Sequence, residues 1–235
     1  GDSNEDALQS GYFCIQVSAG HYENTGLVLG DKNGNPIKNN VYIIGNNDDN
    51  QSGQSNTTDD IEYFKHIDTS NIGDYYCKQL DLGFTFSGLV LVDSNNNYYE
   101  NNFIVFGKPG DGVYTGGTLT SIPDFFPDTG TGDNEYTVND IVIKISIGYW
   151  HNFLLTGDSN GNVIKNNIYA FGDGNSYKLG ISDTNDTAIP TNIGTDNYLD
   201  SNYYGIDIRA SHRSSGIIIG DSKGNPIPNN IYTFG

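Results

Sequence analysis

The chain has 235 residues, with 29 acidic and 11 basic side chains, so its formal net charge at pH 7 is −18. A field of this sign repels phosphate backbones and anionic lipid headgroups, which argues against nucleic acid and membrane surfaces as partners. No apolar run approaches membrane-spanning length, so we expect no membrane insertion. Abundant Gly, Asn and Asp with many Tyr and Phe are typical of short strands joined by tight turns.

One 20-residue pattern occurs four times without gaps, at 26–45, 88–107, 153–172 and 216–235. The copies begin 62 to 65 residues apart, a period typical of a propeller blade. Within each copy an apolar strand, a polar turn and a second strand ending in Gly follow one another, which predicts a hairpin.

Further strands flank each hairpin. Upstream strands are marked by Ile15 and Val17, by Leu80, by Ile143 and Ile145, and by Ile206 and Ile208. Downstream lies a longer, variable, polar stretch, and in two copies it contains an Ile-Pro pair, at 122–123 and 189–190, which suits an outer edge strand. About four strands per copy predict an all-β, β-propeller-like array of four repeats.

Several positions of the repeat have a predicted structural role. Two adjacent Asn follow the turn in every copy, and we expect them to fix the bend before the second strand. The predicted structural residues are Asn39, Asn40, Gly45, Gly107, Gly148, His151, Asn166, Asn167, Gly172 and Gly235.

The third copy carries the most specific motif. It has Gly148 and His151 as GxxH, then Leu155, Gly161, the run Ile-Tyr-Ala-Phe-Gly at 168–172, Leu179-Gly180, and Pro190 with Ile193. This copy resembles the regulator of chromosome condensation repeat, whose blades carry GxxH, a glycine turn, an aromatic-Gly pair and a late Pro. The chain departs from that repeat because Phe or Ile replaces the Trp of the aromatic-Gly pair and the GxxH histidine occurs once.

The resemblance implies blades that belong to a closed seven-bladed ring. Four copies would then need further copies or neighbouring chains to complete the ring. We expect a single repeat domain over 1–235, with blades at about 11–60, 61–125, 126–193 and 194–235, the last without its outer strand.

His151 and its neighbour Trp150 are the main candidates for a site. A histidine beside an indole suits binding or acid–base chemistry, but the resemblance implies a structural role for His151, which we favour. Trp150 stays a candidate binding residue because its ring can stack on a ligand. No HExxH, GxSxG, CxxC or supported carboxylate pair occurs, so we expect no catalytic residue and no enzymatic activity.

The hairpin turns offer a second kind of candidate. Asp31, Asp93 and Asp158 each begin a DxNxN sequence, whose oxygens could bind calcium. No glutamate closes these loops, and the fourth copy has Lys223 at a ligand position, so plain hairpin turns are favoured. We expect no metal and no cofactor.

Cysteines and sequons leave the compartment open. Cys14 and Cys77 fall at equivalent places in consecutive copies, and two free, buried thiols are favoured over a bridge. Asn56 and Asn185 lie in N-x-T sequons that a secreted chain could glycosylate. An extracellular or particle surface is favoured over the cytoplasm.

These observations lead to three functional hypotheses. The first is a non-catalytic binding or scaffold module whose variable loops, 46–78, 108–141 and 173–204, contact a protein partner. The second is a structural subunit of an extracellular or virion-surface fibre or coat, self-associating through open blade edges. The third, implied by the resemblance, is guanine nucleotide exchange on a small GTPase.

Overall fold

The computed structural model describes residues 11–21, 23–54, 59–67, 73–107, 120–121, 141–196, 199 and 202–235. Regular structure in these residues is strand, apart from two short 3-10 helices at Asn175–Tyr177 and Ile193–Asp196. The predicted all-β class is therefore confirmed. None of the helices in the described part of the chain is long and apolar enough to cross a membrane.

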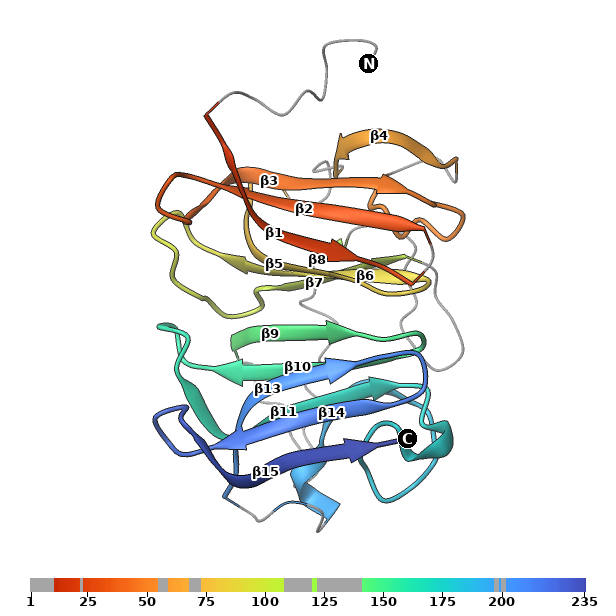
Figure 1. The fold of residues 1–235 in the computed structure, drawn as a ribbon, viewed down its shortest axis with the longest axis vertical. Helices are drawn as coiled ribbons and strands as arrows, with labels where there is room; N and C mark the ends of the chain where they lie inside the picture. The colour runs from red at the N-terminus through yellow and green to blue at the C-terminus, as the bar shows by residue number, and fades with distance from the viewer. Residues whose placement is uncertain are drawn as a thin grey trace. The chain divides into compact units, whose positions relative to one another are not determined.

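The strands form four antiparallel sheets, one for each copy of the repeat (Figure 1). The first contains β1 (Phe13–Ala19), β2 (Asn24–Gly30), β3 (Pro36–Gly45) and β4 (Ile61–His66) in that order. The second contains β5 (Tyr76–Leu82), β6 (Phe86–Val92), β7 (Phe103–Gly107) and β8 (Thr120–Ser121). The third contains β9 (Ile141–Ile147), β10 (His151–Gly157), β11 (Val163–Gly172) and β12 (Thr187–Asn192), and the fourth contains β13 (Tyr204–Ala210), β14 (Ser215–Gly220) and β15 (Pro226–Phe234).

In all four sheets the first strand pairs with the second strand in the same register. The fourth residue of each hairpin pattern pairs with one residue of the strand before it: Leu29 with Cys14, Leu91 with Cys77, Thr156 with Val142, and Ile219 with Gly205. A register shift interrupts each of these pairings at the same place. The equivalence of the copies therefore extends beyond the 20 residues of the pattern.

The sequence analysis located the outer strand β12 but not the full extent of the outer strand β4. Residues 61–66 pair with β3, so the first sheet extends to His66, past the boundary near residue 60 that the sequence suggested. The pair at 189–190 lies in the outer strand β12, where a missing proline N–H is tolerated. The pair at 122–123 lies outside the described residues. The extent of the domain, 1–235, stays a prediction.

The chain folds into two compact units. Unit 1 comprises 1–97, 103–108 and 116–121, and unit 2 comprises 98–102, 109–115 and 122–235. In unit 1, β5 lies against the first sheet, and in unit 2, β13 lies against the third. The first strand of one sheet is therefore the element that packs on the sheet before it.

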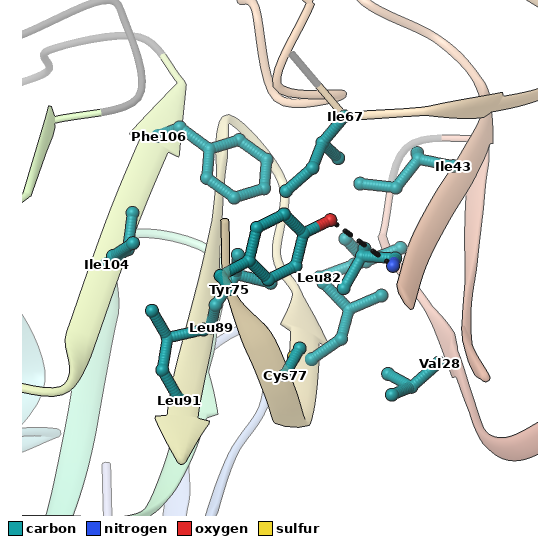
Figure 2. Packing of buried hydrophobic residues seen from close by; sticks show 12 residues of the cluster. Val28, Ile43, Ile67, Tyr75, Cys77, Leu82, Leu89, Leu91, Ile104 and Phe106 are labelled. Atoms are coloured by element: carbon teal, nitrogen blue, oxygen red, sulfur yellow. Dashed lines mark hydrogen bonds between the residues drawn. The ribbon is translucent and has the colours of Figure 1, made fainter. Parts of the chain in front are cut away.

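Each unit has its own apolar core where these elements meet. In unit 1, Tyr75 lies among Ile43, Ile67 and Phe106, and its hydroxyl faces the backbone of β3 (Figure 2). In unit 2, Phe153, Leu155, Ile168 and Ile208 are buried together. Burying one such side chain contributes about 1.5–3 kcal/mol, so these cores are a main source of stability within each pair of sheets.

Candidate binding surface and the contacts that support it

The two adjacent Asn of each copy have different tasks. The first, Asn39, Asn101, Asn166 or Asn229, has a positive φ between 52° and 56°. Asn tolerates this left-handed conformation better than most L-residues because its short amide can bond locally. The sequence predicts a bend before the second strand, but in three copies that strand begins three residues before the first Asn, at Pro36, Val163 or Pro226. The left-handed Asn therefore lies inside the strand, next to the Asn that contacts the neighbouring sheet.

The second Asn binds the backbone of the next sheet. Asn40 Nδ2 donates to the carbonyls of Leu29 (2.8 Å) and Cys77 (2.9 Å), and its Oδ1 accepts the N–H of Cys77 (2.8 Å). Asn167 makes the same three bonds, to Thr156 (3.1 Å) and to Gly205 (3.0 and 2.6 Å). This buried amide links two sheets, a role that the repeat pattern alone did not predict.

The two bonds to the following strand occur a third time. In unit 2, Asn102 donates to the carbonyl of Val142 (2.8 Å) and accepts its N–H (3.0 Å). Cys77, Val142 and Gly205 are the equivalent residues of their strands, so one contact is repeated. In the sequence, the only sign of this contact was the recurrence of the Asn pair in every copy.

The glycine that ends each hairpin is required by its backbone. Gly45, Gly107, Gly172 and Gly235 have φ values of 112°, 127°, 112° and 107°. A Cβ atom on any of them would lie within 2.4 Å of a backbone carbonyl oxygen on the preceding turn. Any other residue would be strained here, so these predicted structural positions accept only glycine.

The segment after the closing glycine forms a second link between sheets. Ser87 Oγ donates to the carbonyl of Gln51 (2.7 Å) in unit 1, and Ser215 Oγ donates to the carbonyl of Lys178 (2.7 Å) in unit 2. Lys178 Nζ lies 2.6 Å from Asp173 Oδ2, with the two side chains 7% and 10% exposed. Burial raises the pKa of Asp173, but hydrogen bonds from Lys178 and Asn175 outweigh it and hold that pKa below its ordinary value.

His151 lies buried beside this link. Its Nε2 is 2.8 Å from Ser215 Oγ, and Ser215 has already given its single proton to the carbonyl of Lys178. Nε2 of His151 is therefore the donor, which fixes the tautomer. Burial, and then the charge of Lys178, lower the pKa of His151 to about 4, so the ring is neutral at pH 7. These contacts join backbone segments and are consistent with the predicted structural role.

Next to His151 is a group of three rings, here called the aromatic patch: Tyr149, which is partly buried, and Trp150 and His212, which are exposed. Trp150 is 47% exposed, and its ring contacts the ring of Tyr149 edge-to-face, with 4.5 Å between the ring centroids. The rings of Tyr149 and His212 also form an edge contact, with 4.3 Å between their centroids. Lys178 Nζ lies 5.9 Å from the centre of the Trp150 ring, within reach of a cation–π interaction.

The aromatic patch is held by backbone hydrogen bonds. The carbonyl of Trp150 accepts the N–H of Asp173 (2.8 Å), and the N–H of Tyr149 donates to the carbonyl of Ser211 (3.2 Å). A Cβ on Gly148 would lie 2.7 Å from the same Ser211 oxygen, which explains the glycine that begins GxxH. The rings therefore project from a rigid turn. Sequence reasoning singled out Trp150 but missed Tyr149 and His212, although two adjacent aromatics in a turn were a visible signal.

The predicted acidic turn residues Asp31, Asp93 and Asp158 lie in the turns that connect the two strands of their hairpins, and Asp158 is at the opposite end of β10 from Trp150. Each carboxylate accepts two backbone N–H groups of its own turn, at 2.8–2.9 Å. Hydrogen bonds from the turn's Asn residues lower the pKa of all three. Among the described residues, no three His, Cys, Asp or Glu side chains are placed to hold a metal ion. Asn185 is exposed, and Asn56 lies outside the described residues.

The two cysteines are free but differ in environment. Cys77 is buried under Asn40, and burial raises its pKa. Cys14 is exposed, so the expectation of two buried thiols is wrong for this residue. The reason is physical: in the described chain no Asn of a preceding sheet covers β1.

Several solved structures are similar to this chain. Human WBSCR16 aligns with a TM-score of 0.61 at 16% identity, covering 87% of this chain and 46% of that one. Prp20p of Saccharomyces cerevisiae aligns with a TM-score of 0.55 at 15% identity, covering 89% and 45%. Yeast RCC1 (Prp20) in complex with Kap60 aligns with a TM-score of 0.54 at 16% identity, covering 90% of this chain and 43% of that one.

The fold is that of the RCC1-type β-propeller. The resemblance seen in the third copy is thereby confirmed at the level of fold. The chain spans less than half the length of these RCC1-type structures. No protein-family model matches the sequence, and no curated protein matches it significantly.

Proposed function

We propose that this RCC1-type chain is a non-catalytic binding or scaffold module that recognises a protein partner through the aromatic patch and the variable segments beside it. One observation carries the proposal. The first strand pairing keeps one register in all four copies, and the Asn contact to a following strand occurs in three of them, whereas the segments after the first three hairpins differ in length and sequence. Such a division suits a rigid frame that presents a variable surface.

The aromatic patch has the properties of an interaction hot spot. Trp and Tyr contribute large contact areas with few rotatable bonds, and they are enriched at the centres of protein interfaces. Here the rings stand on a turn fixed by backbone bonds, so little side-chain freedom is lost on binding. The net charge of −18 would also favour encounter with a basic partner.

Fold similarity is consistent with a protein partner. The yeast Prp20 structures include a complex with Kap60 and a study of binding to Gsp1p and histones, so a frame of this type supports protein recognition. Nucleotide exchange on a small GTPase would rest on the fold alone.

The test compares partner capture by matched variants. The wild-type chain, a Tyr149→Ala/Trp150→Ala variant and a Tyr99→Ala control are immobilised, and captured proteins are quantified and then retested as purified pairs. Tyr99 is 40% exposed, against 47% for Trp150, and it lies between β6 and β7, outside the variable segments. We expect the double variant to weaken a true partner by roughly 30-fold or more, the effect of losing a hot spot of about 2 kcal/mol, and the control to bind normally. Partners bound equally by all three proteins would overturn the proposal.

A further inference from the structure

Tyr177 has a backbone conformation that its packing does not explain. It follows Ser176 in the turn after the third hairpin, and both residues have a positive φ, 63° for Ser176 and 59° for Tyr177. Bulky L-residues rarely adopt this left-handed conformation, because it brings Cβ too close to the following carbonyl oxygen. Burial of the side chain would offset the cost, but Tyr177 is 54% exposed.

The first sheet shows which residue suits this place in the turn. Asn50 has nearly the same φ, 58°, and its N–H and its carbonyl each form one turn bond, at 3.0 and 3.1 Å. Tyr177 makes the same two bonds, to the carbonyl of Gly174 (3.1 Å) and from the N–H of Gly180 (3.0 Å). Asn tolerates the left-handed region better than Tyr does. A tyrosine here is therefore unfavourable for folding, and a strained, exposed residue of this kind indicates a role in binding.

The turn of Tyr177 adjoins the aromatic patch. Lys178 is the next residue, and its Nζ lies 5.9 Å from the centre of the Trp150 ring. The N–H of Asp173, in the same segment, donates to the carbonyl of Trp150 (2.8 Å). Trp150 and Tyr177 are thus two exposed rings on neighbouring turns of unit 2. The Trp150 ring already has a cation within reach, and nearly half of this residue is still exposed.

Exposed carboxylates belong to the same group of turns. Asp186 Oδ1 accepts the N–H of Gly174 (3.0 Å), and Asp183 Oδ1 accepts an N–H of its own turn (2.9 Å). Both aspartates are exposed, and within the described part of the chain neither forms an ion pair. Arg213, on the turn after β13, is exposed as well. Two carboxylates against one guanidinium leave the exposed charge of these turns negative.

We propose that Trp150, Tyr177 and the carboxylates of Asp183 and Asp186 form a site, here called the arginine site, for an arginine side chain of the protein partner. A guanidinium group is planar, so it stacks on aromatic rings while its N–H groups donate to carboxylates. The net charge of −18 draws a basic segment toward this surface. The site rests on the proposed function and adds the chemistry of the partner, an exposed segment that carries arginine.

A neutral sugar is the competing occupant, because sugars also stack on exposed aromatic rings. The two exposed carboxylates favour the cation, since an ionised group gains more from a charged donor than from a hydroxyl. A direct test must therefore separate the charge of the ligand from its shape.

The probe is a short peptide of alternating Arg and Gly, titrated into the whole chain by calorimetry and by the fluorescence of Trp150, the only tryptophan in the sequence. The matched peptide contains citrulline, which keeps the shape of arginine without its charge. We expect saturable binding of the arginine peptide that weakens as salt is raised, and binding of the citrulline peptide that is at least about tenfold weaker. A chito-oligosaccharide titrated in parallel should not bind.

Tyr177→Asn is the decisive variant, because it gives the turn the kind of residue that the first sheet has there. We expect it to unfold at the same or a higher urea concentration than the wild type, yet to bind the arginine peptide about fivefold or more weakly. Trp150→Ala should weaken binding by a similar factor. Asp183→Asn/Asp186→Asn, which keeps an acceptor oxygen for each N–H, should weaken binding and reduce its dependence on salt. Tyr99→Asn changes a Tyr that is 40% exposed elsewhere and should bind normally.

Four results would overturn the arginine site: equal binding of the two peptides, unchanged binding by Tyr177→Asn, a lower urea midpoint in that variant, or binding of the oligosaccharide alone. A protein partner whose capture needs Tyr149 and Trp150 but not Tyr177 would contradict the arginine site and leave the proposed function intact. A normal peptide result with no partner that depends on the aromatic patch would contradict the proposed function instead.

Discussion

Replacing Asn167 with Ala removes a contact that three backbone groups share. The carbonyls of Thr156 and Gly205 and the N–H of Gly205 would lose their partner in a buried place. Each unsatisfied buried group costs about 1–3 kcal/mol, and partial relaxation brings the expected total to about 3–5 kcal/mol. That is a large part of the roughly 5–15 kcal/mol by which a domain is stable, so unit 2 should unfold at a clearly lower denaturant concentration.

Asn230→Ala is the matched control, because it makes the same change at the same repeat position. Asn230 has one partly buried bond, so the expected cost is about 1 kcal/mol. Urea unfolding followed by the fluorescence of Trp150, the only tryptophan in the sequence, reports on unit 2. Hydrogen exchange of the Gly205 amide gives a local readout, which should accelerate in Asn167→Ala. Equal costs for the two variants would show that the contact to the next strand contributes little, and would refute this reasoning.

Four further variants test the supporting contacts by the same unfolding assay. The pKa of His151 is about 4 in the folded state and near 6.5 in the unfolded state, so between these pH values the unfolded state binds more protons. The free energy of unfolding of the wild type should therefore fall by about 3 kcal/mol as the pH drops from 6.5 to 4. His151→Gln has no group that titrates there and should lack this loss. Gly205→Val should cost about 1–3 kcal/mol, because its Cβ would lie 2.4 Å from Ile168 Cγ1; an unchanged midpoint would contradict the packing. Lys178→Met should lower the free energy of unfolding by about 3–5 kcal/mol, because it leaves the buried carboxylate of Asp173 unpaired. The double variant Asp173→Asn/Lys178→Gln introduces the amide pair that Asn46 and Gln51 form after the first hairpin. It should stay within about 1 kcal/mol of the wild type.

Local features of the fold were predictable from the sequence. A turn of Asp, Gly and Asn between two apolar runs specifies a hairpin through backbone preferences that act over a few residues. The closing glycine and the Asn pair could be placed for the same reason. β4 was harder, because Ile61–His66 mixes charged and apolar side chains without clear alternation and was grouped with the following sheet. Its pairing with β3 depends on the long segment between them, which sequence periodicity does not describe.

Contacts between sheets could not be read from the repeat. Asn40 and Cys77 are 37 residues apart, and their bonds depend on the register shift in β5 and on how two sheets pack. Sequence comparison showed that both positions recur, but recurrence does not say which recurrent residue meets which. That information becomes available only when the strands are placed in space.

The wrong expectation for Cys14 shows what decides burial in such an array. Cys14 and Cys77 occupy the same register, yet one is exposed and the other buried, because within the described residues Cys77 alone has the Asn of a preceding sheet over it. Burial is thus a property of the contact between neighbouring repeats and not of the repeat itself. By the same argument, Ile231 is exposed where Val41 and Ile168 are buried because no strand of the described residues packs on it. Residues that are equivalent in sequence but unequal in exposure therefore show which of them take part in contacts between the described repeats.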